Sequence, residues 1–111
     1  MLIENSVAAA TAVVGYDLLQ DQPNATIQPG QRITSVALKG SAAAGDSKVQ
    51  ITAGNITVAE LYNNTTGFPA RDDMVQVDYV HPPGAGATRI YAKVTDAPAS
   101  NPLNIALVRI P

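Results

Sequence analysis

The sequence D-M-V-Q-V-D-Y-V-H-P-P-G-A-G-A-T-R-I-Y-A-K-V-T-D, residues 73–96, decides the fold class. Apolar residues stand at positions 75, 77 and 79 of its first part and at positions 90, 92 and 94 of its last part. An alternation with a period of two places each apolar set on one face of a β-strand. The prolines and glycines between the two runs end strands and reverse the chain. The stretch therefore predicts a β-hairpin with a long loop and one buried face.

The rest of the chain contains further short runs of the same kind. They predict strands over residues 32–39, 48–53, 56–62 and 103–110. The dipeptide Gly54-Asn55 predicts a tight turn between the second and third of these strands. The apolar residues of the third strand change phase near Ala59, which predicts a β-bulge there.

Two runs are apolar on both faces, residues 7–14 and residues 103–110. A strand with one solvated face would alternate, so we expect both runs to be strands that are covered on both sides. Neighbouring strands would cover them if they are central in a sheet, and another subunit would cover them if they lie at a surface.

The number and spacing of these elements predict the architecture. About seven or eight short strands, with turns roughly every ten residues, are typical of β-sandwiches and barrels. We therefore expect an all-β fold, a small jelly-roll-like β-sandwich of about seven or eight antiparallel strands. A chain of 111 residues makes a single domain. Within it, residues 1–30 would form an N-terminal arm with the first strand and a loop, and residues 31–111 the sandwich.

The composition excludes several classes of partner and site. The formal net charge is −2, so we expect no binding to nucleic acid or to an anionic membrane. The chain has no cysteine, which excludes disulfides, thiolate metal sites and a cysteine nucleophile. Only 14% of residues are charged and 46% are hydrophobic, which suits a protein whose surface is partly covered by neighbours. The apolar run near the start follows Glu4 and no Lys or Arg, so it is not typical of a signal peptide, and we expect synthesis in the cytoplasm.

The residues that could carry chemistry are few. His81 is the only histidine, and we expect it to be a loop residue without a catalytic role. The adjacent Asp72 and Asp73 could help to bind a hard cation, but the other carboxylates are dispersed and lack calcium-loop spacing. We therefore predict no enzyme activity, no metal site and no cofactor.

Apolar and aromatic residues supply the candidate binding surfaces. Tyr62 and Phe68 flank an irregular segment and form a possible ligand-binding pair. Together with Tyr91 they could stack on sugar rings, although tyrosines of this kind more often belong to protein interfaces. The predicted protein interface consists of Val7, Ala9, Val13, Val14, Tyr91, Leu103, Ile105, Val108 and Ile110.

Over residues 33–111 the chain resembles a class of virion structural proteins. The resemblance is strongest in P-P-G-A-G-A-T-R-I-Y-A-K-V-T-D-A-P-A-S-N-P-L-N, residues 82–104. It is similar to decoration (cement) and minor capsid proteins of bacteriophages and related icosahedral viruses. The resemblance implies a location in the virion and a shell-stabilising role. It also implies contacts with a major capsid protein and with copies of itself, often as a trimer, and no catalytic residues. A carbohydrate- or receptor-binding module of a viral spike or secreted protein is the alternative.

Overall fold

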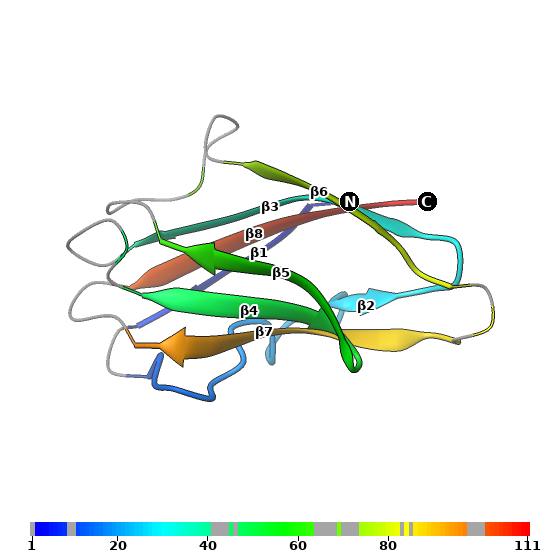
Figure 1. The fold of residues 1–111 in the computed structure, drawn as a ribbon. Coiled ribbons are helices and arrows are strands. Elements are labelled where there is room, and N and C mark those ends of the chain that lie inside the picture. The colour runs from blue at the N-terminus through cyan, green and yellow to red at the C-terminus, as the bar shows by residue number, and fades with distance from the viewer. Residues whose placement is uncertain are drawn as a thin grey trace.

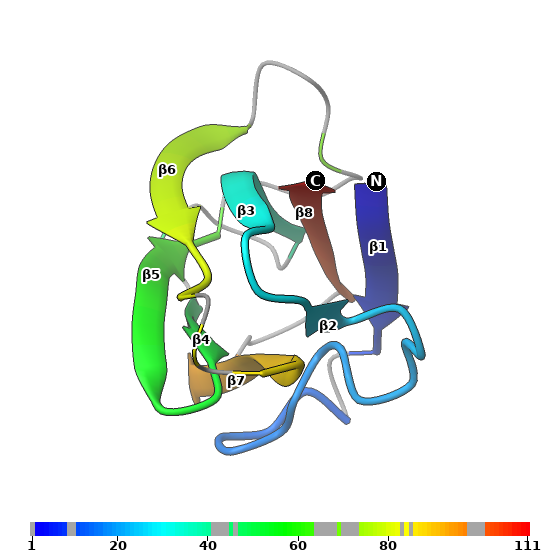
Figure 2. The ribbon, with the colours of Figure 1, turned by 90° about the vertical axis from the view of Figure 1, so that its right-hand side faces the viewer.

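The computed structural model describes residues 2–8, 11–40, 45, 47–63, 69, 74–82, 84, 86–97 and 102–111. Over these residues the chain forms eight β-strands in two four-stranded antiparallel sheets. The sheets lie face to face, with one apolar core between them (Figure 1 and Figure 2). The predicted all-β sandwich is confirmed.

Each sheet combines strands from distant parts of the chain. The first sheet has the order β1 (Leu2–Val7), β8 (Leu103–Ile110), β3 (Arg32–Gly40) and β6 (Val75–Val80). The second sheet has the order β2 (Thr26–Ile27), β7 (Thr88–Asp96), β4 (Lys48–Ala53) and β5 (Ile56–Tyr62). The central strands β8, β3, β7 and β4 carry most of the buried apolar side chains.

The pairing of the strands identifies the connectivity. β1 pairs with β8, β2 with β7, β3 with β6, and β4 with β5, which is the pattern of one long antiparallel hairpin. Rolling this hairpin brings β8 beside β3 and β7 beside β4, and these pairs complete the two sheets. Eight strands in two sheets with this connectivity form a jelly roll, as the sequence predicted.

The hairpin predicted over residues 73–96 is wrong, although both of its strands exist. β6 pairs with β3 in the first sheet, and β7 pairs with β4 in the second sheet. The chain therefore passes from one layer to the other between β6 and β7, at the right-hand end of Figure 1. A period of two shows which residues share a face, but it does not show which strand lies alongside.

The strand predicted over residues 7–14 lies earlier in the chain. β1 ends at Val7, and residues 11–15 lie outside any strand, in turns and irregular backbone. In β1 the side chains at positions 3 and 7 are buried, and those at positions 4 and 6 are exposed. The alternation that defines β1 therefore lies in residues 2–7, before the alanine-rich run.

The β4–β5 hairpin agrees with the sequence residue by residue. The side chains at positions 49, 51 and 53 of β4 are buried, and Gly54 occupies the turn with a φ of 60°. Ile51 pairs with Ala59 and Thr52 with Thr57, so Val58 is the extra residue of a bulge. The bulge predicted near Ala59 is confirmed.

Residues 11–25, which we call the crossing segment, lead from β1 to the free edge of β7. The N–H groups of Gly15 and Leu18 donate to carbonyl oxygens of β7 at 2.7 and 2.8 Å. A carboxylate oxygen of Asp17 accepts from the N–H of Ala92 at 2.9 Å. Leu18 and its neighbour Leu19 are fully buried. The crossing segment therefore closes the core on this side and covers the edge of β7.

Candidate interaction faces

Three residues of the predicted protein interface lie in the core of the sandwich. Val7, Leu103 and Ile105 are at most 6% exposed, and all three belong to the single apolar cluster between the sheets. β8 is apolar on both faces because it lies between β1 and β3, with its inward face on the core. The facing sheet of the same chain, and not a second polypeptide, therefore covers these side chains, and they form no part of a surface.

The outer side of the first sheet carries an apolar face. Leu2 lies beside Val108 in the register of β1 and β8, and it is 54% exposed. Arg32 lies between Ile110 and Val80 in the same sheet, and Val80 is 47% exposed. Small residues fill the middle of this side. Ala37 and Ala106 lie on this side but are only 1% exposed, so we define the apolar face as Leu2, Val80, Val108 and Ile110.

The apolar face retains two residues of the predicted interface, Val108 and Ile110, which are both partly exposed. Exposed charged side chains also lie on this side, because Arg32 stands between Ile110 and Val80, and Glu4 and Asp78 are exposed on β1 and β6. Partly exposed apolar side chains together with an arginine are common in protein–protein contacts. The outer side of the second sheet, in contrast, carries polar cross-strand pairs.

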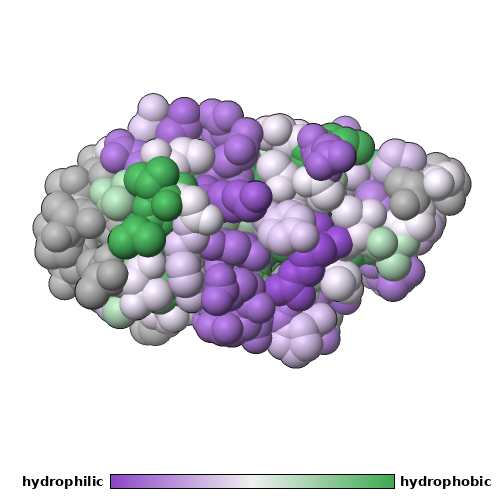
Figure 3. Space-filling model, turned by 90° about the horizontal axis from the view of Figure 1, so that it is seen from below, coloured by the Kyte–Doolittle hydropathy of each residue, from purple (hydrophilic) through white to green (hydrophobic). Residues whose placement is uncertain are grey.

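A second, smaller apolar area lies on the crossing segment. Seen from below in Figure 3, the molecule is mostly hydrophilic or neutral, with a compact hydrophobic area toward its left end. The beginning of the crossing segment lies at this end in Figure 1. Val13 and Val14 of this segment are 54% and 66% exposed, so these two predicted interface residues do lie at the surface. Ala9, also predicted, lies outside the described residues.

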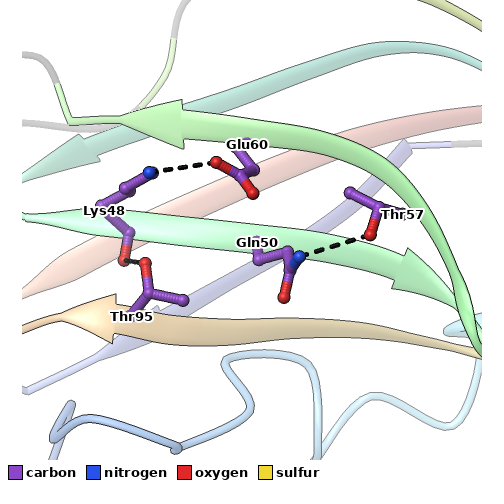
Figure 4. Close-up of polar contacts among 5 residues, drawn as sticks. All are labelled: Lys48, Gln50, Thr57, Glu60 and Thr95. Atoms are coloured by element: carbon purple, nitrogen blue, oxygen red, sulfur yellow. Dashed lines mark hydrogen bonds and ion pairs between the residues drawn. The ribbon is translucent and has the colours of Figure 1, made fainter.

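The outer side of the second sheet, the polar face, carries a regular set of polar pairs. The ammonium of Lys48 lies 3.0 Å from a carboxylate oxygen of Glu60 across β4 and β5, and the amide of Gln50 donates to the hydroxyl of Thr57 at 3.3 Å (Figure 4). The hydrogen bond and the charge of Glu60 raise the pKa of Lys48. Thr95 of β7 also donates to the carbonyl oxygen of Lys48 at 3.2 Å. Cross-strand pairs of this kind suit a face that stays in water.

The polar face also brings together two of the candidate ligand-binding tyrosines. Tyr62 lies opposite Lys48 and Tyr91 lies opposite Thr52, on the two strands that flank β4. Four residues along β4 separate the two positions, so they are about 13 Å apart along the strands and about 10 Å apart across them. A lysine ammonium lies over each ring, Lys48 at 5.4 Å from the centroid of Tyr62 and Lys93 at 5.3 Å from that of Tyr91. Phe68 lies outside the described residues.

His81 has a structural position that the sequence did not reveal. Its side chain is buried, its Nε2 lies 2.7 Å from the carbonyl oxygen of Gly86, and its Nδ1 lies 2.8 Å from the hydroxyl of Tyr79. Because a carbonyl oxygen only accepts, Nε2 carries the proton, and in the neutral ring the Tyr79 hydroxyl donates to Nδ1. Burial also raises the pKa of Tyr79. Both ring nitrogens of His81 are therefore used inside the protein.

The described part of the chain contains no group of three or more His, Asp or Glu side chains placed to hold a metal ion. It also contains no helix long and apolar enough to cross a membrane.

The chain matches no protein-family model, and comparison with curated proteins finds no significant match. The two outer faces of the sandwich are therefore the features that bear on its function.

Proposed function

We propose that this protein is a non-catalytic virion structural protein, a decoration (cement) or minor capsid component. In this proposal it contacts a major capsid protein and copies of itself, and it strengthens the shell through protein–protein contacts. The apolar face of the first sheet is the observation that carries the proposal. Its function would be performed in the virion, after synthesis in the host cytoplasm.

The difference between the two outer faces supports this assignment. Leu2 and Val80 are each about half exposed on one side, whereas the other side pairs Lys48 with Glu60 and Gln50 with Thr57. Burying apolar area contributes roughly 25 cal/mol per Å², before the costs of association are subtracted. A partner that covers the outer side of the first sheet therefore buries Leu2 and Val80, which are both about half exposed. The jelly roll is compatible with this role, since viral capsid proteins use it, but lectins use it too, so the fold alone does not decide.

The proposed location in the virion is tested on virus particles purified by density gradient from infected cultures that produce this chain. Tryptic peptides of the chain should appear in the particle fraction, at a fixed ratio to those of the major shell protein. Absence of the chain from every particle fraction, while it is present in the lysate, would refute the proposal.

The contact face is tested by adding purified chain back to particles that lack it. Val108→Asp places a charge in the apolar face and should abolish binding, because an unpaired carboxylate would be buried at the contact. Thr52→Asp places the same charge on the polar face and should leave binding unchanged. Equal binding of the two variants would show that the first sheet does not face the shell.

A carbohydrate-binding role is the second candidate, and the shared face of Tyr62 and Tyr91 favours it. Two rings on one flat sheet face can stack on separate units of an extended glycan. On a glycan array, Tyr62→Ala and Tyr91→Ala should each lose the signal, whereas Tyr62→Phe should keep it because the ring remains. A wild-type chain that binds no glycan on the array excludes this candidate.

A further inference from the structure

The two sheets have four edges, and three of them are covered or interrupted. On the β2 side of the second sheet, β2 pairs with only two residues of β7, and the crossing segment hydrogen-bonds to β7 beyond them. On β5 the extra residue Val58 breaks the ladder. On β6 the register shifts where Thr34 faces Val77 and Asp78, so this edge also carries a bulge. Covers and bulges are the usual means by which proteins prevent edge strands from pairing with other chains.

The fourth edge, that of β1, has none of these protections. Its six residues pair with β8 in an unbroken register, and its sequence L-I-E-N-S-V contains no Pro and no Lys. Among the described residues, no backbone hydrogen bond reaches residues 2–7 from any strand or loop except β8. A straight strand of this length presents a row of free N–H and C=O groups to a further strand.

We propose that β1 pairs with β1 of a second copy of this chain, antiparallel and about a two-fold axis at Asn5. In antiparallel pairs, residues opposite each other point to the same face, so a two-fold pairing must be centred on a residue. Centring on Glu4 would set two carboxylates opposite each other, which is unfavourable. Centring on Asn5 sets Ile3 opposite Val7 on the inward face, and Glu4 opposite Ser6 on the outward face.

The register centred on Asn5 places compatible side chains opposite each other on both faces of the paired strands. The Ile3–Val7 pair continues the apolar inward side, since both side chains are buried in their own subunit. The Glu4–Ser6 pair joins a carboxylate acceptor to a hydroxyl donor, and both side chains are exposed. The Asn5 side chains do not obstruct the two strands at the two-fold axis, because each amide points inward and donates to the carbonyl oxygen of Leu18 in its own subunit at 2.6 Å.

This pairing would join two four-stranded sheets into one continuous sheet of eight strands. Because the two-fold axis is perpendicular to the sheet, the apolar faces of both copies would lie on the same side. Leu2 and Val108 of each copy would then contribute to a single contact surface. In this respect the inference deepens the proposed function, which needs a large apolar surface facing one way.

Cross-linking between two single-cysteine variants tests the register. The chain has no cysteine of its own, so Glu4→Cys and Ser6→Cys each introduce a unique thiol. Opposite residues of an antiparallel pair have Cβ atoms about 4.5–5.5 Å apart, within reach of a disulfide after a small adjustment. Under mild oxidation a mixture of the two variants should give a mixed dimer. Glu4→Cys alone would give a dimer only in the register centred on Glu4, and that result would overturn the proposal.

Two charge variants test the same pairing without a covalent bond. The two-fold axis produces two Glu4–Ser6 pairs in the dimer. Ser6→Lys therefore places an ammonium opposite Glu4 in both pairs, and Ser6→Glu places a carboxylate there in both. The dimer dissociation constant from sedimentation equilibrium should be lower for Ser6→Lys by on the order of tenfold than for Ser6→Glu. Both substitutions are at an exposed position, so the fold is retained. Equal constants, or a monomer at every concentration for the wild type and both variants, would overturn the proposal.

These measurements use the isolated chain, whereas the proposed function is tested on particles with Val108→Asp. A chain that binds particles but shows no Glu4–Ser6 cross-link would refute the pairing and leave the structural role standing. A chain that cross-links in this register but is absent from particles would refute the structural role and leave the pairing standing.

Discussion

At the scale of single residues, Gly40 shows how tightly β3 and β8 approach each other. Its φ is +133°, and a Cβ built on it would lie 2.1 Å from the carbonyl oxygen of Pro102 and 3.0 Å from the Cα of Leu103. Both contacts are with backbone, which cannot move aside as a flexible side chain would. Gly40→Ala should therefore lower the free energy of unfolding by about 3 kcal/mol or more.

Gly30 is a matched control for this substitution. It has a φ of +85°, but nothing lies within 4 Å of a Cβ built there. Gly30→Ala should cost only the backbone strain, about 1–2 kcal/mol. Urea unfolding followed by circular dichroism measures both variants. Equal losses would mean that the contact with Pro102 is not what excludes a side chain at Gly40.

Tyr79 gives a pH dependence whose sign follows from its burial. Its pKa is raised in the folded protein, so above about pH 10 the unfolded chain loses this proton more readily than the folded chain does. The contribution of Tyr79 is therefore fully present below the unfolded pKa and is lost as the pH rises through the folded pKa. Between pH 9 and pH 11, a rough window around the unfolded tyrosine pKa of about 10, the free energy of unfolding should fall less for Tyr79→Phe than for the wild type. Identical slopes in urea unfolding would contradict this, because all other titrating groups are common to both proteins.

At the scale of elements, the sequence was sufficient where turn residues mark both ends of a strand-like run. β4 is confirmed at both ends from its alternation and its turn, and β8 is confirmed from the apolar run that follows Pro102. The hairpin over residues 73–96 was wrong because periodicity carries no information on partners. The interface predicted on β8 depended on the same missing information about partner strands. Its two apolar faces fitted a central strand as well as a subunit contact, and only the pairing with β1 and β3 distinguishes them.

The attachment of β2 is an element-scale feature that no pattern in the sequence indicated. Arg109, at the end of β8, donates from its guanidinium to the carbonyl oxygens of Asn24, at 2.9 Å, and of Thr26. It thereby joins the first sheet to the short strand β2 of the second sheet. Arg109→Met keeps much of the length of the side chain and removes these donors. The unfolding free energy should fall by about 1–3 kcal/mol, and proteolysis near residues 20–25 should become faster.

Arg32 is the control for this change, because it is exposed on the outer side of the same sheet. Arg32→Met should change the unfolding free energy by less than about 0.5 kcal/mol. Urea unfolding and limited proteolysis, read by mass spectrometry, compare the two variants. Unaltered cleavage in Arg109→Met would show that β2 is held by its pairing with β7 alone.

At the scale of the whole molecule, the jelly roll is not equally packed on its two sides. The crossing segment closes the side of β1 and β7 with two fully buried leucines. On the other side, β6 has no buried residue and β5 has only Leu61. The sequence predicted β6 as well as it predicted β4, since alternation is equally clear in the two strands. It could not predict their burial, which depends on what the rolled hairpin places over each strand.

This asymmetry predicts the order in which the molecule opens. Local opening requires little free energy where few apolar contacts are broken, so the β5–β6 side should open before the rest. In native-state hydrogen exchange, the hydrogen-bonded amides of β5 and β6 should exchange faster than those of β3, β4, β7 and β8. The amides of β8 should exchange only at the rate of global unfolding, because five consecutive residues of that strand are buried between two neighbours. Exchange read by mass spectrometry on overlapping peptic peptides gives this order. Protection of β6 equal to that of β8 would mean that the open side is covered in solution, as it would be if a partner were bound there.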